Sequence, residues 1–232
     1  MKLSTFNLPH CRTQLFLTTK YNRNADNHSI RDIIIDHNAS LVAVMPESEL
    51  VIKFIKARSW HEYLKLLWNH SRVTKEIKGC SLLKNLGLCV PTIYEVGYGI
   101  IPSTKHKYLG YYIMENLTHS GFQELSKLIT KEIIDNEVRN KIMKSIHDGL
   151  KVMKDNHVVF SDFHLDNIFA NNNGDITWID TGVTNYSTFR FHRFNQKFNH
   201  SIKRYINYEY NGKTLLSQSE KAMFSDLLIT ST

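Results

Sequence analysis

The sequence is short of three features that define large classes of protein: paired cysteines, long apolar runs and, before residue 79, glycine. Its three cysteines, Cys11, Cys80 and Cys89, are an odd number without CxxC spacing, which argues against a disulfide framework or a zinc site. No stretch approaches the roughly 20 apolar residues of a membrane-spanning helix, and the first residues lack the apolar core of a signal peptide. The 232 residues, 42% hydrophobic and 22% charged, therefore predict a globular protein of a reducing cytoplasm.

Acidic residues are also few: the sequence has 22 Asp and Glu but 29 Lys and Arg, which gives a formal net charge of +7. This excess predicts an anionic partner such as nucleic acid, a nucleotide, a phosphorylated sugar or an acidic lipid surface. Most of it lies between residues 187 and 213, where aromatic residues are interleaved with the basic ones. By itself this segment fits a stacking surface for nucleic acid, a face for an acidic membrane, or an amphipathic helix with its rings inward. Its basic residues are Arg190, Arg193, Lys197, Lys203, Arg204 and Lys213.

Hydrophobic periodicity predicts a mixture of strands and helices. The expected strands are 33–36, 41–45, 50–55, 92–96, 108–115, 158–160, 167–170 and 176–180, and the expected helices are 60–86 and 125–154. The first three strands are separated by an HNAS turn and by a segment with Pro46, which predicts consecutive hairpins of an antiparallel sheet. Gly87 is expected to end the first helix. Residues 1–30 are polar and Asn-rich with little periodicity, and predict an irregular arm.

Three polar residues in the second half have a spacing that suits phosphoryl transfer. Asp162 and Asn167 lie in the run SDFHLDN, and Asp180 follows in IDTG after a short hairpin. One carboxylate can orient an attacking hydroxyl, while the amide oxygen and the second carboxylate can hold Mg²⁺ against nucleotide phosphates. Mg²⁺ is a hard cation that takes oxygen ligands, which explains the residue types.

These residues resemble motifs of the protein-kinase-like superfamily. Asp162 and Asn167 match the D-x-x-x-x-N of its catalytic loop, and Asp180 begins a D-x-G like its metal-binding motif. Lys53, in LVIKF, is similar to the strand lysine that clamps nucleotide phosphates, and Glu76 to the helix glutamate that pairs with it. The DFHLDN variant resembles small-molecule kinases more than protein kinases. The stretch SRVTKEIKGCSLLKNLGLCVP resembles lipopolysaccharide core kinases, which phosphorylate Kdo or heptose; the resemblance covers residues 31–210.

The resemblance implies an α+β, two-lobed protein-kinase-like fold. Its N-lobe would be an antiparallel sheet in residues 31–117, and its C-lobe a shortened, mostly helical unit in residues 118–232, after the arm 1–30. Residues 112–117 would link the lobes, with backbone around Glu115 and Leu117 reaching the adenine of ATP.

The same resemblance implies an ATP- and Mg²⁺-dependent sugar kinase at the cytoplasmic face of the inner membrane. Asp162 would be catalytic, Lys53 and Glu76 would serve the nucleotide, and Asn167 and Asp180 would bind Mg²⁺. The acceptor would be lipopolysaccharide core or another phosphorylated glycolipid, and no nucleic acid is expected. Contact with this acceptor, or with the anionic membrane surface, would come from Arg190, Arg193, Lys197, Lys203 and Arg204.

The sequence also departs from the superfamily. Because Gly79 is the first glycine, no glycine-rich loop can precede Lys53, and the turn 37–40 would have to take its place. Ser161, before the aspartate of the D-x-x-x-x-N motif, and Thr181, inside the D-x-G motif, stand where the superfamily usually has other residues. The 50 residues after Gly182 are too few for a platform that binds a protein substrate. Two alternatives follow from these features: a catalytically silent kinase-like binding module and a basic nucleic-acid-binding protein.

Several of these residues also have ordinary structural explanations. Lys53 would then be a solvent-facing strand lysine, and Glu76 an exposed helix charge or a partner of Arg72 one turn away. His164 would be a structural hydrogen-bonding residue beside the loop, and Asp166 a turn residue.

Overall fold

The structure is a computed structural model that describes residues 2–6, 8, 14–20, 30–45, 49–59, 61–68, 70–100, 108–186 and 190–229. It is an α+β protein, as predicted, and divides into two compact units. The first contains Met1–Ile77 and Pro91–Ser120, and the second contains Lys78–Val90 and Gly121–Thr232. Within the described part of the chain, no helix combines the length and the apolar character that crossing a bilayer requires.

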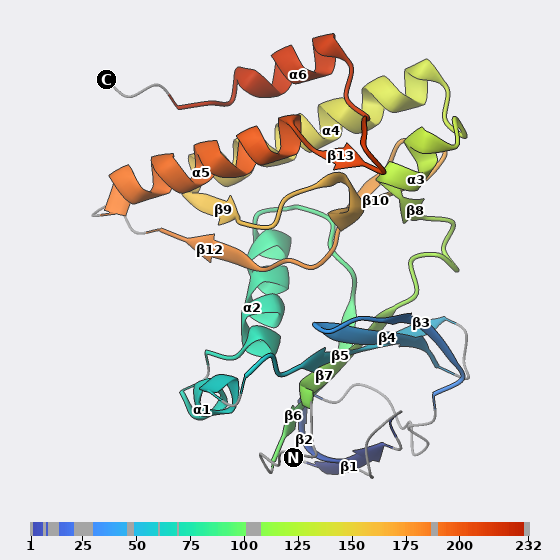
Figure 1. Cartoon of the computed structure of the whole chain (residues 1–232), viewed down its shortest axis with the longest axis vertical. Coiled ribbons are helices and arrows are strands. Elements are labelled where there is room, and N and C mark those ends of the chain that lie inside the picture. The colour runs from blue at the N-terminus through green and yellow to red at the C-terminus, as the bar shows by residue number, and fades with distance from the viewer. Residues whose placement is uncertain are drawn as a thin grey trace. The chain divides into compact units, whose positions relative to one another are not determined.

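A seven-stranded antiparallel sheet forms the centre of the first unit (Figure 1). In spatial order its strands are β1 (Lys2–Phe6), β2 (Gln14–Lys20), β6 (Ile93–Gly99), β7 (Tyr108–Glu115), β5 (Leu50–Lys56), β4 (Ser40–Val44) and β3 (Asp32–Asp36). The predicted hairpins β3–β4 and β4–β5 are confirmed by their antiparallel registers. The backbone N–H of His37 donates to the carbonyl of Ser40 over 2.9 Å and closes the expected turn between β3 and β4.

The prediction of an irregular N-terminal arm is wrong for residues 2–6 and 14–20, which are strands of this sheet. Phe6 and Phe16 are buried and pack edge-to-face, with ring centroids 5.7 Å apart. Their strands lacked a clear apolar alternation because three of their inward positions are polar: Ser4, Gln14 and Thr18. These side chains are bonded within the sheet, as in the 2.7 Å contact between the hydroxyls of Ser4 and Thr18. Residues 1, 7, 9–13 and 21–29 of the expected arm lie outside the described residues.

The single helix expected over 60–86 is two helices, α1 (His61–Leu67) and α2 (Arg72–Asn85). Ser71 begins the second, because its hydroxyl accepts the backbone N–H of Thr74 over 3.2 Å as an N-cap does. Gly87 ends it as predicted, with a φ of +79° and an N–H that donates to the carbonyl of Lys84.

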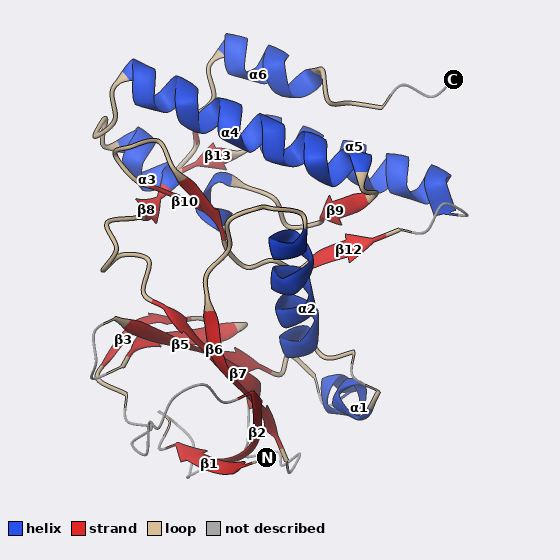
Figure 2. Cartoon of the chain, turned by 180° about the vertical axis from the view of Figure 1, so that it is seen from behind, coloured by secondary structure: helices blue, strands red, loops and turns tan. Residues whose placement is uncertain are grey.

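The second unit combines helices with small sheets of two or three short strands (Figure 2). Its helices are α3 (Leu125–Thr130), α4 (Asn136–Asp155), η1 (Leu165–Asn167), α5 (Phe191–Ile206) and α6 (Gln218–Ser225). Its strands are β8 (Gln123–Glu124), β9 (Val158–Phe160), β10 (Ile168–Ala170), β11 (Ile176–Trp178), β12 (Val183–Asn185), β13 (Glu209–Tyr210) and β14 (Lys213–Thr214). The helix expected over 125–154 is interrupted, because the Asp135 carboxylate caps a new start by accepting the N–H of Val138.

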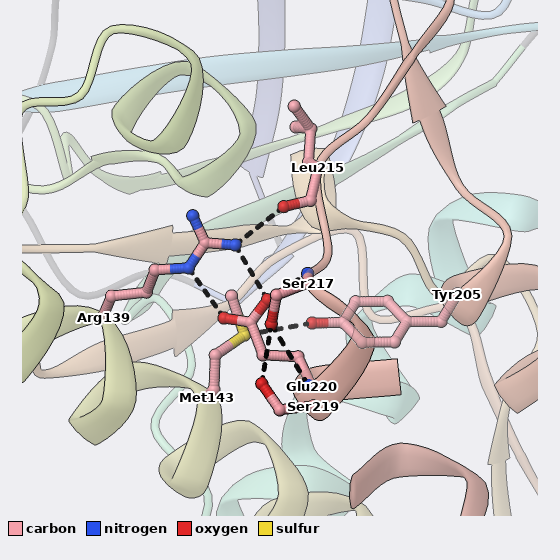
Figure 3. Close-up of polar contacts among 7 residues, drawn as sticks. All are labelled: Arg139, Met143, Tyr205, Leu215, Ser217, Ser219 and Glu220. Carbon is pink, nitrogen blue, oxygen red and sulfur yellow. Dashed lines mark hydrogen bonds and ion pairs between the residues drawn. The ribbon is translucent and has the colours of Figure 1, made fainter. Parts of the chain in front are cut away.

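Aromatic packing and one polar cluster hold this unit together. The buried rings of Phe163 and Tyr205 stack with centroids 4.2 Å apart, which fastens the loop after β9 to α5. In the polar cluster, the Arg139 guanidinium of α4 donates to both carboxylate oxygens of Glu220 in α6 over 2.7 and 2.8 Å (Figure 3). The backbone N–H of Ser217 also donates to Glu220, so α6 is held at its first turn.

Candidate active site

In the first unit, Lys53 lies in the middle of β5, where it is flanked by Val42 on one side and Tyr112 on the other. It is only 4% exposed, so it is not the solvent-facing lysine of the structural alternative. Its Nζ donates to Glu76 Oε2 over 3.1 Å, and it lies 5.8 Å from the centre of the Tyr112 ring. The pairing that the resemblance implied is therefore present, while the binding of a nucleotide by these residues stays a prediction.

Glu76 is held from a second side by a residue that the sequence did not single out. The Tyr112 hydroxyl donates to Glu76 Oε2 over 2.8 Å, the same oxygen that Lys53 contacts. Only the register of β5 against β7 brings Tyr112 beside Lys53, and no local sequence pattern encodes that register. Arg72, the alternative partner of Glu76, donates instead to the carbonyls of Ala39 and Lys56. These contacts orient the glutamate across the helix–sheet interface.

The turn 37–40, expected to take the place of a glycine-rich loop, needs no glycine for its backbone. None of its residues is among the described residues with positive φ, so the turn is open to ordinary side chains. The carbonyl of Ala39 accepts the N–H of Lys56 over 3.0 Å, and Arg72 lies 3.4 Å from the same oxygen. The turn is thus tied to β5 and α2. Whether it serves phosphates stays a prediction.

The expected linker 112–117 is in part a strand, because its first four residues belong to β7. The Glu115 carboxylate accepts the backbone N–H of Thr92 over 3.1 Å, and the N–H of Glu115 donates to the Thr92 carbonyl. Leu117 is buried in the same unit. The strand predicted over 108–115 is thus confirmed as β7, and the expected linker overlaps its last four residues.

In the second unit, Asp162 and Asn167 belong to one tightly bonded loop between β9 and β10. The amide Nδ2 of Asn167 donates to the Asp162 carbonyl over 2.7 Å, and the backbone N–H of Asn167 donates to His164 over 3.0 Å. Because the amide nitrogen is engaged, Oδ1 is the side-chain atom of Asn167 that a cation would bind. The carbonyl of Asn167 accepts the N–H of Ile179, which brings the residue before Asp180 to this loop.

Asp180 has a strained backbone beside a close helix contact. Its φ is +52°, in the left-handed region that non-glycine residues rarely adopt and that recurs at functional sites. The next residue, Thr181, is buried against α2 at Gly79, where a Cβ would lie 1.7 Å from the Thr181 carbonyl oxygen. The sequence marked Gly79 only as the first glycine. The structure shows that the absence of a side chain there lets the helix backbone support the Asp-Thr-Gly loop.

The Asp162 carboxylate is contacted by Arg204, which comes from the last turn of α5. Arg204 Nη2 lies 2.8 Å from Asp162 Oδ1, and His164 Nε2 lies 4.0 Å from the same oxygen. The His164 ring stacks on Tyr208 with centroids 5.3 Å apart, and the Tyr208 hydroxyl donates to the carboxylate of Asp166. Burial, with the Asp166 bond, raises the pKa of Tyr208, so this hydroxyl stays protonated as a donor.

The five basic residues expected to contact the acceptor all lie at or on α5, but the structure joins only one of them to the candidate site. Arg190 is the N-cap residue of α5, and Arg193, Lys197 and Lys203 are exposed along the helix. Arg204 alone among them has an ion pair with Asp162 in the described part of the chain.

Comparison with known proteins found no match: no model of a protein family matches the chain, and no curated protein matches it. Nor do three or more His, Cys, Asp or Glu side chains gather into a possible metal site, within the residues that the structure describes. A cation held by Asn167 and Asp180 would therefore need further oxygen ligands, of the kind that nucleotide phosphates supply.

Proposed function

We propose that the protein is an ATP-dependent kinase of the protein-kinase-like type that phosphorylates a sugar hydroxyl, Kdo or heptose, in the lipopolysaccharide inner core. The observation that carries this proposal is the ion pair of the buried Lys53 with the largely buried Glu76, whose side chains are 6% and 14% exposed. Burying two charges is costly, and hydrophobic residues of similar size stabilise a fold as well or better. A nucleotide-binding role gives the pair a purpose that a purely structural protein lacks, and Tyr112 adds an oriented donor to it.

The chemical step assigns one task to each side chain. Asp162 orients the acceptor hydroxyl and takes its proton as the new bond from oxygen to the γ-phosphorus forms. The bond from that phosphorus to the bridging oxygen breaks, and ADP leaves with the electron pair. Lys53, oriented by Glu76, neutralises phosphate charge on the nucleotide. Mg²⁺, when bound through Asn167 Oδ1 and the Asp180 carboxylate, supplies further charge neutralisation.

The acceptor proposal rests on the basic residues of α5. They give the second unit an exposed cationic helix, with Arg204 beside Asp162. A phosphorylated glycolipid at the cytoplasmic face of the inner membrane would offer the opposite charge, both on its sugars and in the surrounding lipid. We accordingly propose peripheral attachment to that surface.

A transfer assay tests the proposal. Purified protein with γ-labelled Mg-ATP should label deacylated core oligosaccharide, and Asp162→Asn should reduce the rate by at least about a hundredfold, the scale of general-base assistance. Asp155→Asn, which removes an exposed carboxylate at the end of α4, is the matched control and should leave the rate unchanged. Equal rates for the wild-type protein and Asp162→Asn would refute the proposal.

A catalytically silent binding module is the second candidate, and the Arg204–Asp162 ion pair is the observation that favours it. An aspartate held by arginine could serve architecture alone. This candidate predicts no phosphate transfer to any sugar acceptor by the wild-type protein, even where a thermal shift shows that Mg-ATP binds.

A further inference from the structure

The ion pair between Asp162 and Arg204 is unusually placed, because it engages the carboxylate to which the proposed function assigns the acceptor hydroxyl. Arg204 Nη2 lies 2.8 Å from Asp162 Oδ1, and the side chains are 48% and 63% exposed. An acceptor hydroxyl that approaches Oδ1 must therefore compete with a guanidinium. The same guanidinium is within reach of any group attached close to that hydroxyl.

The exposure of the pair decides how easily it can rearrange. Solvent-exposed ion pairs contribute about 0–1 kcal/mol, so little is lost when Arg204 turns from Asp162 to another anion. A guanidinium binds a phosphate or a carboxylate with two parallel hydrogen bonds, a geometry that a single carboxylate oxygen of Asp162 does not offer. An anionic group on the acceptor can thus take Arg204 while the hydroxyl takes its place on Asp162.

The rest of α5 favours the approach of such a group. Arg193, Lys197 and His200 precede Arg204 at intervals of three or four residues, which places all four on one face of the helix. Each of the three is exposed, and α5 contains no acidic residue. Lys203, about 100° around the helix from Arg204, lies off this face. This row ends at Arg204, the residue that contacts Asp162.

We propose that Arg204 is a specificity-determining residue, which selects acceptors that carry a phosphate or carboxylate next to the hydroxyl to be phosphorylated. The inference rests on the proposed function and adds to it the residue that reads acceptor charge. Without such an acceptor, Arg204 stays paired with Asp162. When the acceptor is bound, Arg204 binds its anionic group, and the Asp162 carboxylate is released to contact the acceptor hydroxyl. If Arg204 merely neutralised Asp162, its loss would change the rate by the same factor for every acceptor.

The test compares acceptors that differ only in charge. Deacylated core oligosaccharide is used intact, after carboxyl reduction, and after dephosphorylation. Mass spectrometry identifies the hydroxyl that receives the phosphate, and only transfer to the hydroxyl that is phosphorylated in the intact acceptor is counted. For the wild-type protein we expect kcat/KM to fall about tenfold or more in the arm that removes the recognised group, the scale of a charge-assisted contact. The arm that shows the fall identifies that group as carboxylate or phosphate.

Three variants separate recognition from general charge. In Arg204→Gln, kcat/KM should change less than about threefold after either treatment. Arg204→Lys keeps the charge but cannot form two parallel hydrogen bonds, so its change in kcat/KM should lie between that of Arg204→Gln and that of the wild-type protein. Lys151→Gln removes an exposed charge from α4 and should keep the wild-type response. The inference would be overturned if Arg204→Gln lowered kcat/KM by the same factor for every acceptor. It would also be overturned if neither treatment changed kcat/KM of the wild-type protein. In both cases the proposed function would survive. A wild-type protein that phosphorylates none of the acceptors would refute the proposed function and this inference together.

Discussion

The backbone of α2 at Gly79 lies directly against the carbonyl oxygen of Thr181, where a Cβ would approach within 1.7 Å. No rotamer change can relieve such a contact, because both groups are close to the backbone. The helix and the Asp-Thr-Gly loop must therefore separate if any side chain is added.

Gly79→Ala should consequently destabilise the second unit by about 1–3 kcal/mol, the usual cost of overpacking, although alanine is the better helix former. Urea unfolding measures the change. Lys78→Ala, at the neighbouring exposed position of α2, is the control and should stay within about 0.5 kcal/mol of the wild-type protein. A stabilised Gly79→Ala would show that the helix and loop are not packed as described.

Removal of one partner from the Lys53–Glu76 pair should cost more than removal of both. Glu76→Gln removes the negative charge that the buried ammonium of Lys53 contacts over 3.1 Å, and should destabilise the protein by about 1–3 kcal/mol. The double variant Lys53→Met/Glu76→Gln should recover part of that loss, and unfolding of the four proteins of this cycle measures the coupling. Tyr112→Phe, which removes only one donor to Glu76, should cost about 0.5–1.5 kcal/mol. Additive losses in the two single variants would show that Lys53 and Glu76 do not stabilise each other.

The Arg139–Glu220 cluster should make stability depend on pH in the acid range. Burial acts to raise the pKa of Glu220, but hydrogen bonds from Arg139 and Ser217 outweigh it, and the pKa falls below its ordinary value of 4.5. A depressed folded-state pKa contributes stability above pH 4.5, and this contribution is lost as the pH falls through the folded value.

Urea unfolding of the wild-type protein and Glu220→Gln between pH 7 and pH 3 tests this dependence. The wild-type protein should be the more stable at pH 7, and the difference should shrink below pH 4.5. Glu137→Gln, in the first turn of α4, is the control. A difference that stays constant over the whole range would show that Glu220 does not titrate in this way.

Asp180 should account for the Mg²⁺-dependent part of nucleotide binding. Asp180→Asn should lose most of the extra thermal stabilisation that Mg²⁺ adds to ATP, because a neutral amide is a weaker ligand of a hard cation. Thermal shifts with ATP alone and with Mg-ATP separate the two contributions. Asp175→Asn, another exposed aspartate in the turn before β11, should behave as the wild-type protein does. An unchanged response in Asp180→Asn would remove this residue from the proposed metal site.

Sequence patterns predicted those strands whose inward residues are apolar, and they failed where polar residues point inward. The strands β3, β4 and β5 contain short β-prone runs of apolar residues, whereas β2 buries Gln14 and Thr18 beside Phe16. A pattern of hydrophobicity cannot detect a strand whose buried face is partly polar. The break between α1 and α2 falls at Ser71, whose hydroxyl caps α2 through a hydrogen bond, and a hydrophobic pattern does not report such a cap.

The sequence by itself determined the local chemistry of the candidate site: the five-residue interval from Asp162 to Asn167, the Asp-Thr-Gly run after it, and the clustering of basic residues between 190 and 213. These features depend only on the spacing of residues along the chain, which can be read directly from the sequence. Only the tertiary structure decided which groups are partners, pairing Glu76 with Lys53 and Tyr112 rather than Arg72, and Arg204 with Asp162. Each of these contacts joins residues from different elements. Strand register and packing bring such elements together, and neither is encoded in a short stretch of chain.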